Sequence, residues 1–206
     1  MLYNLALLKN SAYVNTRMAN IPPEVQTEWD RVFSDESMAK YGARWVVYCS
    51  CTWCSEEYHA FAVNTYTDIQ ARIAQIKEIE KTAWFQYAEV FNLLGTSSEE
   101  PQMPAFPNPI YQLFIARNNP LIEANQARET DEDETARWAL WQESMTRTGA
   151  SVVLYCDSYW ANEDYLGFGL VAFPSVEARQ EHAADLMKMK WTQFYSAFTL
   201  LGTPIA

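Results

Sequence analysis

The chain has 206 residues, a formal net charge of −11, and a composition that is 49% hydrophobic and 15% aromatic. Such an acidic chain is a poor nucleic-acid binder, which needs clustered Lys and Arg, and an equally poor ligand for an anionic membrane surface. No stretch reaches the roughly 18 uninterrupted apolar residues that a membrane helix needs. A strand-like run begins at Leu2 with no basic region or cleavage site ahead of it, so we expect a cytoplasmic protein.

The first half of the chain predicts a strand, a helix and a hairpin. Residues 3–8 form a short apolar run of strand length. Residues 22–42 predict a helix, which two prolines open and a glycine closes. Residues 44–53 and 58–66 are rich in Val, Tyr and Trp and flank a polar turn, so they predict a β-hairpin.

A second helix and a last strand complete this half. Asp68 is a typical helix N-cap, and residues 88–94 form a short strand ended by Gly95. The helix between them carries apolar side chains at helical spacing, which predicts one buried stripe. That stripe consists of Ile69, Ile73, Ile76 and Ile79.

The second half repeats this order of elements. Its predicted strands and helices are residues 111–116, 135–145, 151–159, 165–173, a helix capped by Ser175, and 195–201. Residues 97–109 hold four prolines and no periodicity, which is typical of a linker. We therefore expect a first repeat over residues 1–96, a Pro-rich linker over 97–109 and a second repeat over 110–206.

The two halves are also related in sequence. Shifting the chain by 107 positions places residues 36–96 on 143–203 without a gap, and 22 of the 61 pairs are identical. Each half then reads βαββαβ, the ferredoxin-like plan, whose helices cover one face of the sheet. The predicted fold class is α+β, with two ferredoxin-like repeats packed sheet-to-sheet as an intrachain α+β barrel that buries both open faces.

One corner of the first repeat resembles a known family. The segment Lys81-Thr82-Ala83-Trp84-Phe85-Gln86-Tyr87-Ala88-Glu89-Val90, together with the strand over residues 2–9, resembles darcynin-type proteins. These are similar to the antibiotic-biosynthesis monooxygenases and EthD-like proteins of the dimeric α+β barrel superfamily. The resemblance implies a small, often aromatic ligand inside the barrel or between sheet and helices. Members include cofactor-free oxygenases, isomerases, cyclases and haem enzymes.

Strand alternation suggests which side chains line a cavity, because successive residues point to opposite faces. We assign Leu166, Phe168 and Leu170 to the helix side of their strand, and the small residues between them to the barrel interior. Small residues leave room for a ligand, and tyrosines give an apolar wall polar contacts. The predicted ligand-binding residues are Asn4, Tyr48, Ser50, Tyr58, Gln112, Tyr165, Gly167 and Gly169.

Asp157 is the candidate catalytic base. An acid within an apolar strand should have a raised pKa and serve in proton transfer, with Tyr155 orienting the substrate. The alternative is that Asp157 lies at the strand end and caps the turn. His59 is a second candidate for proton transfer, with a structural role as its alternative.

The cofactor expectation is none, with haem as a further alternative. Some haem-binding relatives place an axial histidine on the last helix, where this chain has His182; a solvent-facing histidine is the alternative. Cys49, Cys51 and Cys54 are read as buried thiols or as a metal or redox site. Asn15, Arg17 and Asn20 are polar candidates in a segment that covers the cavity mouth.

The sequence thus predicts a small-molecule enzyme that acts on an apolar or aromatic substrate by cofactor-independent oxygenation, cyclisation or isomerisation. A non-catalytic ligand-binding or structural protein of the same fold is the alternative, and a haem protein is the third. The expected partner is a small apolar or aromatic molecule, with no nucleic acid and no membrane, and the expected assembly is a monomer or homodimer.

Overall fold

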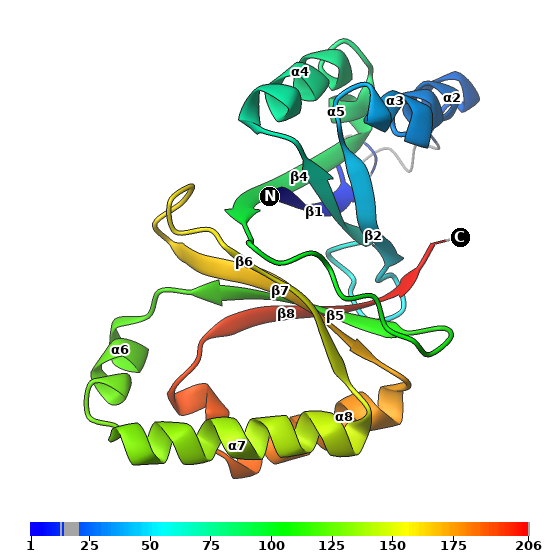
Figure 1. Cartoon of the computed structure of the whole chain (residues 1–206). Coiled ribbons are helices and arrows are strands. Elements are labelled where there is room, and N and C mark those ends of the chain that lie inside the picture. The colour runs from blue at the N-terminus through cyan, green and yellow to red at the C-terminus, as the bar shows by residue number, and fades with distance from the viewer. Residues whose placement is uncertain (13, 15–20, 206) are drawn as a thin grey trace. The chain divides into compact units, whose positions relative to one another are not determined.

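The computed structural model describes residues 1–12, 14 and 21–205 (Figure 1). Three predicted polar candidates, Asn15, Arg17 and Asn20, lie outside the described residues. The chain divides into two compact units, residues 1–100 with Ile205 and residues 101–204. None of the described helices combines the length and the apolar character needed to cross a membrane.

Unit 1 is a four-stranded antiparallel sheet in the order β4-β1-β3-β2, with helices on one face (Figure 1). Asp68 accepts a hydrogen bond from the backbone N–H of Ala71, so the predicted cap of the second helix is present. The elements of unit 1 are β1 (Leu2–Asn10), α2 (Pro23–Val32), α3 (Asp35–Ala39), β2 (Arg44–Ser50), β3 (Ala60–Tyr66), α4 (Ile69–Ile79), α5 (Trp84–Tyr87) and β4 (Ala88–Thr96).

Unit 2 repeats this plan with the strand order β6-β7-β5-β8. Helices α7 and α8 run side by side across one face of its sheet (Figure 1). Ser175 caps α8 by accepting from the N–H of Ala178, as predicted. The elements of unit 2 are β5 (Ile110–Arg117), α6 (Pro120–Gln126), α7 (Asp131–Thr148), β6 (Ser151–Asp157), β7 (Tyr165–Phe173), α8 (Val176–Lys188), the 3-10 turn η1 (Trp191–Gln193) and β8 (Ala197–Pro204).

Two segments differ from the predicted order of helices. The single helix expected over residues 22–42 is broken into α2 and α3, because Ser34 has an extended backbone and caps α3 by accepting from the N–H of Ser37. The segment after β5, where no helix was predicted, contains α6, which Asn119 caps. In both places a side-chain oxygen that satisfies helix N–H groups decides where the helix begins.

The facing assignment for β7 is wrong. Val171 and Phe173 pack with Met145 of α7, so they point to the helices, and Gly167 and Gly169 share their face by alternation. Phe168 and Leu170, which we assigned to the helix side, point to the other face and are fully buried there. The same inversion applies in unit 1, where the β1 face that carries Leu2 and Leu8 packs on the helices.

The order of elements and the strand pairing confirm the predicted fold class, α+β with two ferredoxin-like βαββαβ repeats.

Candidate ligand-binding site

Unit 1 contains a cavity of about 340 Å³ between the helix-facing side of its sheet and α2, α4 and α5. The floor is built from alternate residues of the strands, since these point to one face. On β1 the lining residues are Asn4, Ala6 and Leu8, and on β3 they are Ala62, Asn64 and Tyr66. Ala6 pairs with Ala62 across β1 and β3, so two methyl side chains meet at the middle of the floor and leave room above it.

One end of this floor is polar. The phenol oxygen of Tyr66 accepts from Asn64 Nδ2 at 2.7 Å and donates to Gln75 Oε1. Asn4 Nδ2 donates to Asn64 Oδ1 at 3.4 Å. Burial raises the pKa of Tyr66, although Arg72 and Asn64 oppose the increase, so this phenol remains a neutral donor near pH 7.

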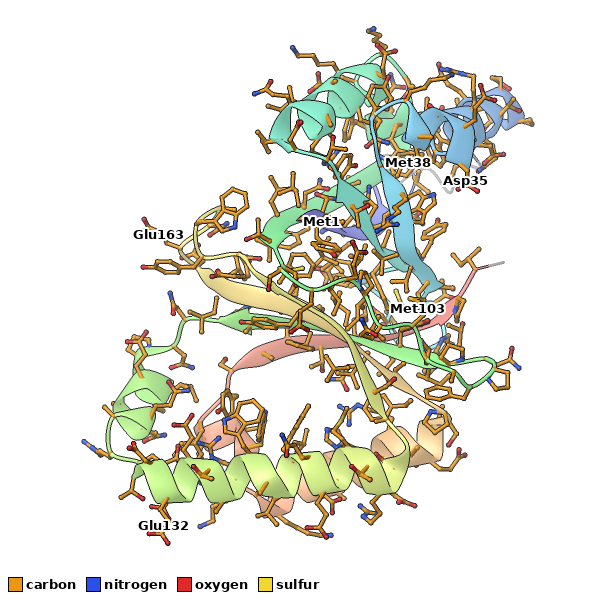
Figure 2. The ribbon with its side chains drawn as sticks, in the orientation of Figure 1. Met1, Asp35, Met38, Met103, Glu132 and Glu163 are labelled. Atoms are coloured by element: carbon orange, nitrogen blue, oxygen red, sulfur yellow. The ribbon has the colours of Figure 1, made fainter. Side chains whose placement is uncertain are left out.

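Gln75 anchors the same network to α3. Its Nε2 donates to the sulfur of Met38, which Figure 2 labels on that helix. Gln75 and Met38 are each 1% exposed, so the network is held in a dry and tightly packed place.

A cation completes the polar end. Arg72 of α4 is 8% exposed and donates from Nη2 to Asn92 Oδ1 at 3.1 Å. Its guanidinium carbon lies 5.4 Å from the centroid of the Tyr66 ring, within the range of a cation–π interaction. Burial lowers the pKa of Arg72, and the neighbouring Tyr66 partly offsets this; an arginine nevertheless stays protonated at neutral pH.

The other end of the cavity is aromatic. Trp29 and Trp84 meet edge to face with 4.4 Å between ring centroids, and Phe33 lies 4.9 Å from Trp84. Leu8 and Val90 close the floor beneath them. Such an apolar chamber with a few polar groups at one end is typical of sites for small organic molecules.

Tyr48 and Asp30 lie at the mouth. The Tyr48 ring stacks on Trp45 at 5.7 Å and is 39% exposed. Burial raises the pKa of Tyr48, and the charge of Asp30 adds to the effect. Asp30 is exposed and accepts from Gln26 Nε2 at 2.8 Å, so its carboxylate is solvated rather than part of the buried polar end.

Of the eight predicted ligand-binding residues, Asn4 and Tyr48 line this cavity. Ser50 lies at the end of β2, where its hydroxyl is 3.2 Å from that of Thr52. Tyr58 precedes β3, and its carbonyl oxygen accepts from the Cys51 thiol. The other four predicted residues belong to unit 2.

Gly167 and Gly169 leave room for protein side chains. A Cβ on Gly169 would come within 2.5 Å of Phe114 Cζ, and a Cβ on Gly167 within 2.8 Å of Tyr155 Oη. The Phe114 and Tyr155 rings stack with 6.2 Å between centroids. The space that we expected for a ligand beside these glycines is therefore occupied by two aromatic rings of unit 2.

Gln112 and Tyr165 have neighbours within unit 2. Gln112 is the counterpart of Asn4 and is buried, and its Oε1 has no partner among the described residues. Tyr165 begins β7, and the guanidinium carbon of Arg117 lies 5.6 Å from its ring centroid.

The three candidate catalytic residues do not converge on the cavity. Asp157 is exposed at the end of β6, and its carboxylate accepts from the N–H of Tyr159 at 3.0 Å, which is the turn-capping alternative. Tyr155 is 50% exposed, and burial of the rest of the ring, followed by Asp157 and Cys156, raises its pKa. His59 lies before β3, with its backbone bonded to Leu8 and Cys51.

The cysteines behave as separate thiols. Cys49 and Cys51 are fully buried, and burial raises the pKa of each to about 12. Cys54 is exposed and donates to the carbonyl oxygen of Cys51 at 3.3 Å. Within the described part of the chain, no three His, Cys, Asp or Glu side chains gather closely enough to hold a metal ion.

Arg72 and the buried polar network are the features that the sequence prediction missed. A signal was present, because Arg72 and Arg179 are identical at equivalent positions of the two repeats. We instead expected α4 to bury Ile69, Ile73, Ile76 and Ile79, of which the structure buries Ile79 and packs Ile76 on the aromatic cluster. The structure exposes 40% of Ile69 and 41% of Ile73, and it buries Arg72 and Gln75.

Solved structures share this fold across the whole chain. A double mutant of chlorite dismutase from Candidatus Nitrospira defluvii matches with a TM-score of 0.72 and 11% identity, covering 100% of this chain and 91% of that one. The imidazole complex of the same enzyme matches with a TM-score of 0.69, 11% identity and the same coverage. A heme-binding protein from Thermus thermophilus matches with a TM-score of 0.67 and 9% identity, again covering 100% and 91%.

These matches place the chain in the tandem ferredoxin-like, dimeric α+β barrel class of folds, as predicted. No protein-family model and no curated protein matches it. The narrower likeness to darcynin-type and antibiotic-biosynthesis proteins stays a prediction.

Because some proteins of this fold bind haem, the two histidines must be tested as iron ligands. His182 is 4% exposed, and its Nδ1 lies 2.9 Å from the Ser144 hydroxyl. Its ring is packed between Phe173, at 5.6 Å, and Trp141, at 6.3 Å. The expectation that His182 faces solvent is therefore wrong, because protein side chains enclose its ring.

The described lining of the unit 1 cavity does not provide an iron ligand. Neither histidine lines it, and no Cys or Met is among its described lining residues. Haem iron is usually held by an imidazole, a thiolate, a thioether or a phenolate. The buried phenol among the described lining residues, that of Tyr66, is already bonded to Asn64 and Gln75. The described lining residues of this cavity therefore do not fit a haem.

Proposed function

We propose that unit 1 binds a small, mainly aromatic molecule in the cavity between its sheet and its helices. The aromatic end, formed by Trp29, Phe33 and Trp84, receives the ring system. The polar end, around Asn4 and Tyr66, orients the molecule through hydrogen bonds. This is the binding-protein alternative of the sequence prediction, located on the helix side of the sheet.

Two orphaned polar atoms carry this proposal. Asn4 Oδ1 and Trp29 Nε1 are buried, and neither has a hydrogen-bond partner among the described residues. Both residues line the cavity. Because buried polar groups in native proteins are nearly always bonded, an unpaired acceptor and an unpaired donor at one cavity point to a ligand or ordered water that completes them.

Binding is a better-supported role than catalysis. Proton transfer needs an acid or base within hydrogen-bond reach of the substrate. Asp157, Tyr155 and His59 are not among the lining residues of the cavity, and the carboxylate found among the described lining residues, that of Asp30, is exposed at its mouth. The buried polar side chains inside are amides, a phenol and a guanidinium, which suit recognition.

The test is a fluorescence titration of the full chain with N-phenyl-1-naphthylamine, a neutral aromatic probe whose emission rises in an apolar site. We expect saturable binding at one site per chain. Ala6→Leu and Ala62→Leu fill the middle of the floor and should each weaken binding by about tenfold or more, because the added methylenes occupy the ligand's volume.

Ala127→Leu is the matched control, since Ala127 is exposed on unit 2 and the same atoms are added there. It should bind the probe like the original chain. Unsaturable binding, or equal affinity in Ala62→Leu and Ala127→Leu, would remove the cavity from consideration. Circular dichroism of each variant verifies that the fold is intact.

A further inference from the structure

We infer that the cavity selects a monocarboxylate, with the carboxyl group of the aromatic ligand held by Arg72. This inference rests on the proposed function and adds the chemical class of the ligand. It is carried by the position and surroundings of a single buried cation.

Arg72 has no counter-charge within the described part of the chain. It is 8% exposed and lines the cavity, yet no Asp or Glu there forms an ion pair with it. A buried charge is costly unless it is paired and hydrogen-bonded. Its contacts, the Asn92 oxygen and the Tyr66 ring, are both uncharged. An anionic ligand group supplies what is missing.

The orientation of α4 supports the same reading. Ile69 and Ile73 are 40% and 41% exposed, whereas Arg72 and Gln75 are buried beside the cavity. Burial of Ile69 and Ile73 in place of Arg72 and Gln75 would be the favourable choice for the hydrophobic effect alone. The same face of α4 also carries Ile76 and Ile79 into the cavity, so the helix places one cation among apolar lining residues.

The geometry favours one carboxylate over a phosphate. A planar guanidinium matches the two oxygens of a carboxylate with parallel N–H···O bonds. No lysine and no second arginine lines the cavity among the described residues, so a dianionic phosphate would remain half neutralised. The unpaired Asn4 Oδ1 accepts a hydrogen bond from a neighbouring hydroxyl or N–H of the same ligand.

Unit 2 provides a matched control at the equivalent position. The guanidinium carbon of Arg179 lies 5.7 Å from the Phe173 ring centroid, as Arg72 lies over Tyr66. Arg179 is half-buried, its Nε is buried without a partner among the described residues, and it does not line the cavity.

The experiment is isothermal titration calorimetry of the full chain at pH 7.4 with 2-naphthoate and with its neutral isostere 2-naphthamide. We expect naphthoate to bind about tenfold or more tightly, as a charge-assisted hydrogen bond to a buried arginine predicts. Arg72→Met, which keeps most of the side-chain volume, should abolish that preference and leave the amide affinity within about twofold. Arg179→Met should retain the preference.

Each possible result either supports or overturns the inference that Arg72 holds a carboxylate. If the amide binds the original chain as tightly as the acid, the anion inference is overturned while the cavity function survives. A preference that persists in Arg72→Met, or that disappears equally in Arg179→Met, also overturns it. If neither compound binds, the proposed function fails and the inference fails with it. The comparison of the two compounds in the original chain stands even if a variant does not fold.

Discussion

The guanidinium of Arg72 lies over the ring of Tyr66, and the duplicated chain repeats this pair as Arg179 over Phe173. The residues around the pair differ between the units. Where unit 1 has Tyr66, Gln75 and Asn92, unit 2 has Phe173, His182 and Thr199. The Tyr66 phenol and the carboxamides of Gln75 and Asn92 thus occur in unit 1 alone. This difference explains how a duplicated fold holds an asymmetric site.

Replacing Tyr66 by Phe tests this difference directly. The variant keeps the ring but removes the hydroxyl that joins Asn64 to Gln75. It should lower the free energy of unfolding by about 1–3 kcal/mol, because two buried groups lose their partner. Urea unfolding measures the change. Tyr48→Phe removes the hydroxyl of a side chain that is 39% exposed and has no hydrogen-bond partner among the described residues, so it should stay within about 0.5 kcal/mol of the original chain. Equal losses in the two variants would contradict a structural role for the buried network.

Gly169→Ala should destabilise unit 2. The added Cβ would lie within 2.5 Å of Phe114 Cζ and 2.6 Å of the Leu154 carbonyl oxygen. Overpacking of this kind costs about 1–3 kcal/mol, measured as a lower urea midpoint. The double variant with Phe114→Leu should recover part of the lost stability. The second substitution removes the Phe114 ring from the contact but leaves the Leu154 carbonyl oxygen in place. An unchanged midpoint in Gly169→Ala would mean that open space adjoins Gly169, as the sequence prediction assumed.

The strand assignments explain why the fold was predictable and the site was not. Hairpins, caps and the repeat follow from local signals, such as the Asp68 and Ser175 side chains that accept helix N–H groups. The side of a strand that meets the helices can be predicted from alternation only when the opposite side is exposed and polar. All seven residues of β3 are buried, so alternation shows which residues share a face but not which face meets the helices.

The same limit applies to α4. Its isoleucines recur at helical spacing and predict a buried stripe, yet Ile69 and Ile73 are exposed and Arg72 is buried. Hydrophobic periodicity describes a helix that packs for stability alone. It fails where a helix presents polar groups to a cavity, and such failures are expected at functional sites.

Alkylation should separate the four cysteines. Cys49, Cys51 and Cys156 are fully buried, and burial raises the pKa of each to about 12. Since the thiolate is the reactive form, iodoacetamide at pH 8 should modify Cys54 alone in the folded protein. Intact-mass spectrometry should show one adduct before, and four after, unfolding in urea. Protection of Cys54 that a chelator relieves would instead revive the metal alternative for this segment.

His182 should make the stability of the protein depend on pH. Burial, followed by the charge of Arg179, lowers its pKa from 6.5 to about 4, although Asp185 opposes the shift and Arg147 adds to it. Between these two values the unfolded chain binds a proton that the folded chain does not. Stability is therefore full above pH 6.5 and falls by about 1.4 kcal/mol per pH unit as the pH drops toward 4.

His182→Gln isolates this effect, because Gln75 occupies the equivalent buried position in unit 1. The hydrogen bond from Lys188, with those from Ser144 and Arg147, holds the pKa of Asp185 well below its usual value. The contribution of Asp185 to stability is therefore lost only at more acidic pH, below the range in which His182 acts. Urea midpoints measured at pH 7.5, 6.5, 5.5 and 4.5 should fall steeply for the original chain and more gently for the variant. Parallel curves would show that His182 has the same pKa in the folded and unfolded protein, because such a histidine contributes no slope.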